Sequence, residues 1–234
     1  MKNVAIVLSA GVGKRMNTNI PKQYLDLCGK PVIYYALKAF QDSFMDEIVL
    51  VCGKDDIDYC RKEIVEKYDL TKVTKIVPGG KERYHSVGNG LKAINDADYV
   101  YVHDGARPFV DDKIINNAFE CVKKTDACIV GVAVKDTIKV IAEDGAVIDT
   151  PPRKSLFQVQ TPQAFSYELL MDTYKLLAER EEELLQQGIS ITDDAMLIEN
   201  LSKKKVYIAE GSYTNIKITT NEDMIFARSI IEGK

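Results

Sequence analysis

The sequence predicts a single α/β domain built on a Rossmann-like, mostly parallel twisted sheet with helices on both faces. Short β-branched runs alternate with segments of helical periodicity, and the strand-like runs are almost entirely apolar. Such strands, separated by helices, are typical of parallel sheets that helices cover on both sides. The 234 residues suffice for one substantial core, and no repeat, linker or low-complexity tract divides residues 1–234.

The expected elements follow one another along the whole chain. Asp111 precedes an apolar pattern of helical spacing and is a favourable N-cap residue, and Thr219 and Glu222 are spaced as a capping box for the last helix. We expect strands at 4–8, 47–52, 73–77, 98–103, 127–133 and 206–209, and helices at about 31–41, 55–67, 84–95, 112–123, 166–186 and 221–232.

One segment departs from this alternation and predicts a projecting β-hairpin arm at about 134–153. Residues 132–141 alternate as in a strand, Asp144-Gly145 is typical of a tight turn, and the strand pattern resumes before Pro151-Pro152. Two isolated strands are only marginally stable in water. We therefore expect the arm to dock on a partner, a second copy of the chain.

Composition excludes several classes of function. No apolar run approaches the ~20 residues that span a bilayer, and the N-terminal segment lacks a signal-peptide pattern, so we expect a cytoplasmic protein that binds no membrane. A net charge of −4 argues against a nucleic-acid surface. Five cysteines without metal-like spacing and only two histidines argue against a zinc site.

A glycine-rich, basic loop follows the first expected strand and predicts a site for phosphate groups. Around Gly11 and Gly13, small residues let backbone N–H groups approach phosphate oxygens, while Arg15 and Lys22 supply positive charge. The spacing fits neither a Walker loop nor a dinucleotide-binding fingerprint.

Three further polar or basic loops are expected at the same edge of the sheet. Residues 79–86 follow the third expected strand, 104–108 follow the fourth, and 215–217 lie near the C-terminus. Because ligands bind beyond the carboxyl ends of parallel strands, we expect these loops to face Arg15. A negative protein that gathers cations at particular loops is expected to bind small anions.

These motifs resemble those of the 2-C-methyl-D-erythritol 4-phosphate cytidylyltransferase family. The first loop, A-G-x-G-x-R-M followed by P-K-Q-Y, is similar to the signature of nucleoside-triphosphate transferases, and H-D-G-A-R-P at 103–108 resembles the hallmark of the family. Similar runs stand at 79–87, 134–139, 160–165, 192–195 and 210–217.

The resemblance implies a nucleotidyltransferase fold and the transfer of CMP from CTP to 2-C-methyl-D-erythritol 4-phosphate. The products would be CDP-methylerythritol, for isoprenoid precursor biosynthesis, and pyrophosphate. It implies Mg²⁺ as the cofactor, held mainly by the triphosphate, with no certain metal ligand in the chain. The partners would be CTP, a small sugar-alcohol phosphate, and a second copy bound through the arm.

The resemblance also implies a role for each loop residue. Arg15 and Lys22 would stabilise the transition state at the α-phosphate, and Lys217 would position the attacking phosphate. No general base is expected, because the nucleophile is already an anionic phosphate, and we expect His103 to orient the strand end by a hydrogen bond. The catalytic residues would be Arg15, Lys22, Arg153 and Lys217. The nucleotide would contact Ser9, Ala10, Gly11, Gly13, Gly80, Lys81, Ser86 and Asp104. The sugar phosphate would contact Asp104, Arg107, Thr137, Arg153, Thr161 and Lys217, with Thr137 and Arg153 reaching the neighbouring subunit.

Two departures and several alternatives accompany this interpretation. Lys81 stands where the family often has Asp, and Leu8-Ser9 where it often has Pro-Ala. The alternative function is a ribitol-5-phosphate cytidylyltransferase, whose relatives tend to carry Ser-Val in place of Gly105-Ala106. A sugar-1-phosphate nucleotidyltransferase would share only the first loop, and a nucleotide sensor would not need all the phosphate cations. An NAD-dependent enzyme would want a third glycine and an acid where Gly53-Lys54 stands.

Overall fold

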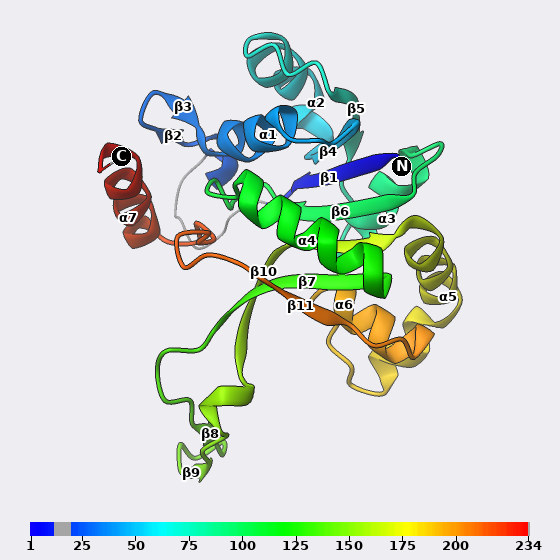
Figure 1. Ribbon diagram of the computed structural model, residues 1–234, viewed down its shortest axis with the longest axis vertical. Helices are drawn as coiled ribbons and strands as arrows, with labels where there is room; N and C mark the ends of the chain where they lie inside the picture. The colour runs from blue at the N-terminus through cyan, green and yellow to red at the C-terminus, as the bar shows by residue number, and fades with distance from the viewer. Residues whose placement is uncertain (12–19, 234) are drawn as a thin grey trace.

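The computed structural model describes residues 1–11 and 20–233 and is centred on a seven-stranded sheet (Figure 1). The strands lie in the order β11-β7-β10-β6-β1-β4-β5, and every pairing is parallel except the two that β10 makes with β6 and β7. All six expected strands are present, so the predicted fold class is confirmed. They are β1 (Asn3–Ser9), β4 (Glu47–Cys52), β5 (Val73–Pro78), β6 (Tyr99–Asp104), β7 (Ala127–Ala133) and β11 (Tyr207–Glu210).

The sequence prediction missed β10 (Phe157–Ser166), which lies between β6 and β7 in the middle of the sheet. Its polar residues and Pro162 do not look like a central strand. The pairing with β7 shifts register between Val159 and Gln163, so the ladder is interrupted around this proline. The buried side-chain amides of this strand form hydrogen bonds with loops of the functional site and not with neighbouring strands.

The six expected helices are also present. They are α1 (Val32–Asp42), the continuous helical segment of η3 (Lys54–Asp56), α2 (Ile57–Tyr59) and η4 (Cys60–Glu66), then α3 (Arg83–Ala93), α4 (Asp112–Thr125), α5 (Tyr167–Gln186) and α7 (Asn221–Glu232). The short α6 (Asp194–Leu197), continued by η6 (Ile198–Ser202), was not expected. The remaining pieces are η2 (Lys22–Tyr24), β2 (Asp26–Leu27), β3 (Lys30–Pro31) and η5 (Arg153–Ser155).

Helix capping follows the sequence, with one correction. Asp111 caps α4 as expected, because its side chain accepts a hydrogen bond from the Ile114 N–H at 2.9 Å. The capping box of α7 begins at Thr220 and closes with Asp223, one residue later than the expected pair. The Asp223 carboxylate also accepts from the Thr219 N–H at 2.7 Å, which fixes the start of the helix.

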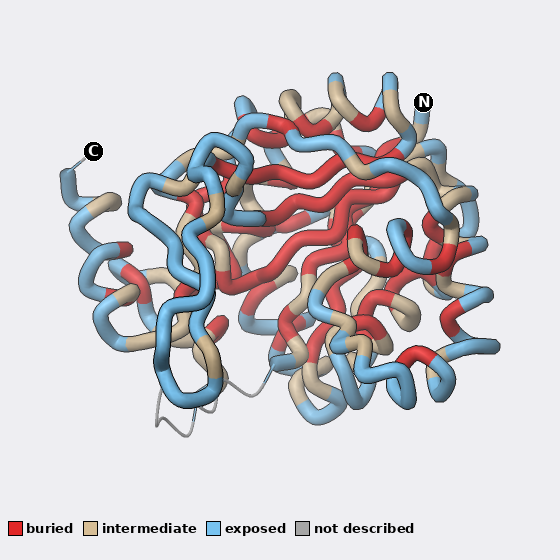
Figure 2. Tube along the Cα trace, turned by 90° about the horizontal axis from the view of Figure 1, so that it is seen from below, coloured by how far each residue is buried: buried red, intermediate tan, exposed pale blue. Residues whose placement is uncertain are grey.

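Helices cover both faces of the sheet because strand residues point alternately to each side. Ala5 and Val7 of β1 face a cluster that includes residues of α1, η4 and α4, whereas Val4 and Ile6 face one that includes residues of α3 and α5. The central strands are accordingly buried along most of their length (Figure 2). Among the described residues, no helix is long and apolar enough to cross a bilayer.

The expected arm projects away from the sheet, but less of it is strand than predicted (Figure 1). β7 ends at Ala133, and only β8 (Val140–Ile141) and β9 (Val147–Asp149) pair in the arm. The expectation of strand geometry through 132–141 is therefore wrong for 134–139, where the backbone pairing ends with the Val134 N–H, which donates to the Leu156 carbonyl at 3.1 Å. The turn is as expected, with Gly145 at φ +87°, where glycine is favoured.

Two glycines of α3 should respond oppositely to alanine. A Cβ at Gly90 would lie 2.8 Å from Ile6 Cγ2, whereas one at Gly88 would meet the Tyr174 ring at 3.5 Å, an ordinary contact. Gly90→Ala should lower the free energy of unfolding by about 1–3 kcal/mol through overpacking. Gly88→Ala should raise it by up to about 1 kcal/mol through helix propensity. Urea unfolding followed by circular dichroism measures both, and equal stability of the two variants would contradict tight packing at Gly90.

Candidate active site

The loops at the carboxyl ends of β1, β5 and β6 gather around one pocket of about 250 Å³. This confirms that the loops meet at one edge of the sheet. Gly13 and Arg15 lie outside the described residues. The pocket lining includes Ser9, Ala10, Gly11, Lys22, Gly80, Lys81, Ser86, Asp104 and Lys217, which are all the other residues predicted to contact the nucleotide together with two of the predicted catalytic residues.

Gln23 fixes the first loop, and sequence reasoning did not single it out. Its side chain is buried, and its amide nitrogen donates to the carbonyl oxygens of Ser9 at 2.6 Å and Gly11 at 3.1 Å. Both carbonyls belong to the pocket wall. Its place beside Lys22 in the P-K-Q-Y run was the available signal.

The second loop is ordered from within and pressed against the first. The Ser86 hydroxyl accepts from the Gly80 N–H at 3.0 Å and donates to the Glu82 carbonyl at 3.2 Å. A Cβ at Gly79 would lie only 2.2 Å from the Ala10 Cβ, so the close approach of the two loops requires glycine there.

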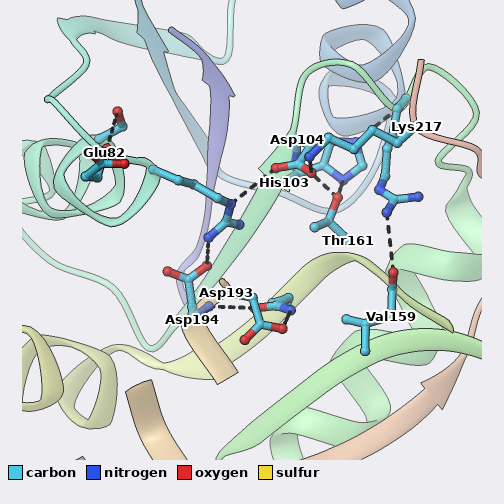
Figure 3. Close-up of polar contacts among 12 residues, drawn as sticks. Glu82, His103, Asp104, Val159, Thr161, Asp193, Asp194 and Lys217 are labelled. Atoms are coloured by element: carbon cyan, nitrogen blue, oxygen red, sulfur yellow. Dashed lines mark hydrogen bonds and ion pairs between the residues drawn. The ribbon is translucent and has the colours of Figure 1, made fainter. Parts of the chain in front are cut away.

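A row of alternating charges leads from Lys217 and Asp104 at the pocket through Arg83 to the buried Asp194 (Figure 3). Lys217 Nζ lies 2.7 Å from Asp104 Oδ2, Arg83 Nε lies 3.5 Å from Asp104 Oδ1, and Arg83 Nη1 lies 2.7 Å from Asp194 Oδ2. Burial alone would raise the pKa of Asp104, but Arg83 and Lys217 hold it well below its usual value. Asp104 is thus a carboxylate, and neither Arg83 nor Asp194 was among the predicted site residues.

Asp194 anchors this row because it is fully buried and fully bonded. Its other carboxylate oxygen accepts from the Tyr174 hydroxyl at 2.6 Å, and its N–H donates to Gln163 Oε1 at 3.1 Å. Burial and the neighbouring carboxylate raise the pKa of Tyr174, so this hydroxyl keeps its proton. The only sequence signals for the pair were the E-R and T-D-D-A runs.

A second pocket of about 340 Å³ adjoins the first and shares Arg83, Asp104 and Lys217 with it. Arg107 and Thr161, both predicted to bind the sugar phosphate, line this second pocket. Much of the Arg107 guanidinium is already occupied, since Nη1 donates to the Asn215 carbonyl at 2.8 Å and Nη2 to the Val159 carbonyl at 3.4 Å. Arg107 therefore braces three segments of the pocket wall.

His103 orients the end of β6, as expected. It is fully buried, with Nδ1 3.0 Å from Thr161 Oγ1 and Nε2 3.1 Å from the Arg107 carbonyl. Thr161 Oγ1 in turn accepts from the Asp104 N–H at 3.1 Å. Burial lowers the pKa of His103 to about 4, so the imidazole is neutral near pH 7 and has both nitrogens engaged.

The two arm residues of the prediction lie apart from these pockets. Thr137 and Arg153 are exposed and line neither pocket of their own chain. Arg153 Nη1 donates to the Lys135 carbonyl at 2.7 Å, across the base of the arm.

Comparisons with known proteins agree over almost the whole chain. A sequence model of the family described as 2-C-methyl-D-erythritol 4-phosphate cytidylyltransferase matches residues 3–233. Proteins of that name from Lachnoclostridium phytofermentans and Clostridium novyi are each 50% identical, with the matches covering 98% and 99% of this chain and 96% and 97% of the relatives.

Solved structures show the same likeness. The 4-diphosphocytidyl-2C-methyl-D-erythritol synthase of Anaerococcus prevotii superposes with a TM-score of 0.83 at 36% identity, covering 99% of this chain and 96% of that one. The cytidylyltransferase of Thermus thermophilus gives 0.76 at 25% identity, covering 99% and 100%.

The buried imidazole predicts a specific pH dependence of stability. An unfolded histidine titrates near pH 6.5, while folded His103 titrates at about 4. As pH falls between these values, the unfolded chain takes up a proton that the folded chain does not, so stability decreases by up to about 1.4 kcal/mol per pH unit. Between pH 7.5 and 5.5, the free energy of unfolding of His103→Asn should fall by about 1 kcal/mol less than that of the wild type, as measured by urea unfolding. Equal losses of stability in the variant and the wild type would show that His103 is not buried as a neutral imidazole.

Proposed function

The chain belongs to the 2-C-methyl-D-erythritol 4-phosphate cytidylyltransferase family, and we propose that its two adjoining pockets hold the two substrates of that reaction. The enzyme transfers CMP from CTP to 2-C-methyl-D-erythritol 4-phosphate, which gives CDP-methylerythritol, an isoprenoid precursor, and releases pyrophosphate. One observation carries the placement: Arg83, Asp104 and Lys217 line both pockets. The reacting phosphates of the two substrates would meet at these shared residues.

In this assignment CTP occupies the pocket between the first and second loops. Ser9, Ala10 and Gly80 would border base and ribose, while Lys22 would lie along the triphosphate with Arg15 of the undescribed segment. Attack at the α-phosphorus builds negative charge on its equatorial oxygens and on departing pyrophosphate. Fixed cations stabilise that charge more than they stabilise bound CTP, because they need no reorganisation as it develops.

The sugar phosphate would enter the second pocket with its anion directed at Lys217. The phosphate is itself the nucleophile, so the site has to orient and neutralise two mutually repelling polyanions rather than move a proton. His103 is consistent with this mechanism, since both of its ring nitrogens are hydrogen-bonded within the chain and are not available to move a substrate proton. The ion pair between Asp104 and Lys217 would weaken when the phosphate binds to Lys217.

Mg²⁺ fits the residues that line the nucleotide pocket. Mg²⁺ prefers oxygen ligands and is commonly held by one or two carboxylates together with substrate phosphates. Glu82 and Asp104 supply carboxylates at the pocket, and no three His, Cys, Asp or Glu side chains are grouped for a metal among the described residues. We propose that the triphosphate supplies most of the ligands. Bound there, the ion would neutralise phosphate charge and polarise the α-phosphorus.

The ribitol-5-phosphate alternative is disfavoured by the packing of Gly105. Its N–H donates to the Leu8 carbonyl at 2.8 Å, and an added Cβ would lie 2.9 Å from that oxygen. The Ser-Val pair expected of that alternative would therefore require the third loop to move away from the end of β1.

We expect the purified chain to release pyrophosphate from CTP with 2-C-methyl-D-erythritol 4-phosphate. Ribitol 5-phosphate in its place, or UTP in place of CTP, should lower kcat/KM by at least about tenfold, because each leaves polar groups of a formed pocket unmatched. A coupled pyrophosphate assay measures all three. Equal activity with UTP would remove the cytidylyl assignment and would first implicate Lys81.

We propose that the arm binds a second copy of the chain. Ile141 and Ile148 are 61% and 66% exposed, and Val140 and Val147 are also exposed on the paired strands. The base of the arm is held, since the Tyr213 hydroxyl donates to the Ala133 carbonyl at 2.8 Å. An apolar hairpin presented on a fixed base is expected to be covered by a partner.

Each active site would then combine both chains, with Arg153 and Thr137 reaching the second pocket of the partner. Their exposure and distance from the pockets of their own chain support this arrangement. We further propose a cytoplasmic location, in keeping with all five cysteines being free thiols.

A shared site predicts complementation between two impaired variants. Arg153→Ala and Lys22→Ala should each reduce kcat by about 10²–10³ as homodimers, because each removes a charge at the reacting phosphates. In the mixed dimer one site carries both lesions and the other carries neither, so it should regain half the wild-type activity. Pyrophosphate release is measured after re-equilibrating the variants. No recovery despite subunit exchange, shown by mass spectrometry, would mean that Arg153 serves its own chain.

A further inference from the structure

A third cavity lies between α3 and α5, separate from the two substrate pockets. Its volume of about 260 Å³ is close to that of the nucleotide pocket. The small residues Gly88 and Ala178 leave room between the two helices. The lining consists of Tyr84, His85, Gly88, Asn89 and Lys92 from α3 and of Met171, Tyr174, Lys175, Leu177, Ala178 and Glu181 from α5.

The lining carries a carboxylate at one end and cations at the other. Met171 and Leu177 contribute apolar side chains, whereas Lys92 and Lys175 contribute cations towards one end. Lys175 pairs with Asp172 at 2.7 Å, but the ammonium group of Lys92 forms no hydrogen bond or ion pair with any of the residues that the structure describes. A mostly apolar cavity with a few placed polar groups is typical of small-molecule sites.

The opposite end of the cavity carries an anion, the Glu181 carboxylate, whose oxygens are already engaged in contacts within the chain. Glu181 accepts from the Tyr84 hydroxyl at 2.7 Å and lies 3.2 Å from His85 Nε2. The Tyr84 bond is the main reason that the pKa of Glu181 is lowered. A ligand anion would therefore be drawn to Lys92 and Lys175, with its apolar part between the helices.

Two residues of this wall are bonded to the active site. His85 Nδ1 accepts from the Glu82 N–H at 3.2 Å, and Glu82 lines the nucleotide pocket. Tyr174 donates to Asp194, the buried partner of Arg83. A molecule packed on His85 and Tyr174 would hold both in these positions.

We propose that the groove between α3 and α5 is an effector site for a small amphiphilic anion, a short apolar chain carrying a phosphate group, and that its occupation tightens nucleotide binding. The ligand would favour the arrangement in which His85 holds Glu82 at the nucleotide pocket. Since coupling is reciprocal, CTP would tighten effector binding by the same factor.

Hexyl phosphate is a suitable probe, and the full chain can be titrated calorimetrically with and without CTP. We expect hexyl phosphate to bind at least about tenfold more tightly than hexanol or inorganic phosphate, because only hexyl phosphate uses both parts of the groove. It should lower the Kd of CTP by about fivefold, the lower end of typical coupling. Binding measured without nucleotide keeps failure of this site distinct from failure of the proposed reaction.

Matched variants locate the site. Ala178→Phe should fill the groove and abolish hexyl phosphate binding, while Glu179→Phe, outside the groove on the same helix, should leave it unchanged. Lys92→Gln should weaken binding about tenfold, and Lys62→Gln on η4 should not. The His85→Ala variant should still bind hexyl phosphate, but the probe should no longer lower the Kd of CTP for this variant.

The proposal would be overturned if hexyl phosphate failed to bind, or if Ala178→Phe and Lys92→Gln bound it like their controls. A rise in the Kd of CTP would overturn it as well, because it would place the probe among the phosphate loops. Retained coupling in His85→Ala would remove the proposed route between the sites.

Discussion

The site depends on one buried charge, the carboxylate of Asp194. A fully buried carboxylate is costly unless it is paired and hydrogen-bonded. Arg83 supplies the pair and Tyr174 the hydrogen bond, so α3 and α5 must both approach α6 closely. With one side of its guanidinium so fixed, Arg83 can bind Asp104 only at the boundary of the two pockets. The position of Lys217 follows, since its ammonium binds the other oxygen of Asp104.

β10 serves the same arrangement. Gln163 accepts from the Asp194 N–H and donates to Asp193, while Gln160 donates to the Ser212 carbonyl at 2.8 Å. The polar residues of this central strand are thus the means by which the sheet holds the loops that carry Asp194 and Lys217. Thr161 extends the set by joining His103 to the Asp104 N–H.

These two features explain what the sequence could and could not predict. The parallel strands and their loops were predictable, because apolar alternation and glycine-rich turns are local signals. β10 was not, because its polar residues make sense only beside loops distant in sequence, and neither was the role of Arg83, whose partner Asp194 lies 111 residues away. Gln23 acts through two backbone carbonyls, so its place in the P-K-Q-Y run was the only signal and did not reveal its role. In the arm the alternation of Val134 and its neighbours suggested strand pairing, but beyond the hydrogen bond from the Val134 N–H to the Leu156 carbonyl, residues 135–139 pair with no strand of the described chain.

The alternating row also explains how a protein of net negative charge can keep cations ready for two polyanions. Without substrates, clustered cations would repel one another, and long side chains would lose the geometry that the transition state needs. Asp104 and Asp194 remove most of that repulsion and hold Arg83 and Lys217 in place. The two carboxylates are not equivalent: Asp194 is inaccessible and stays paired, whereas Asp104 lies at the pocket boundary, where phosphates can compete for Lys217. An arriving phosphate therefore replaces a carboxylate as the partner of a cation that is already in position. Little of the binding energy is then needed to arrange the site.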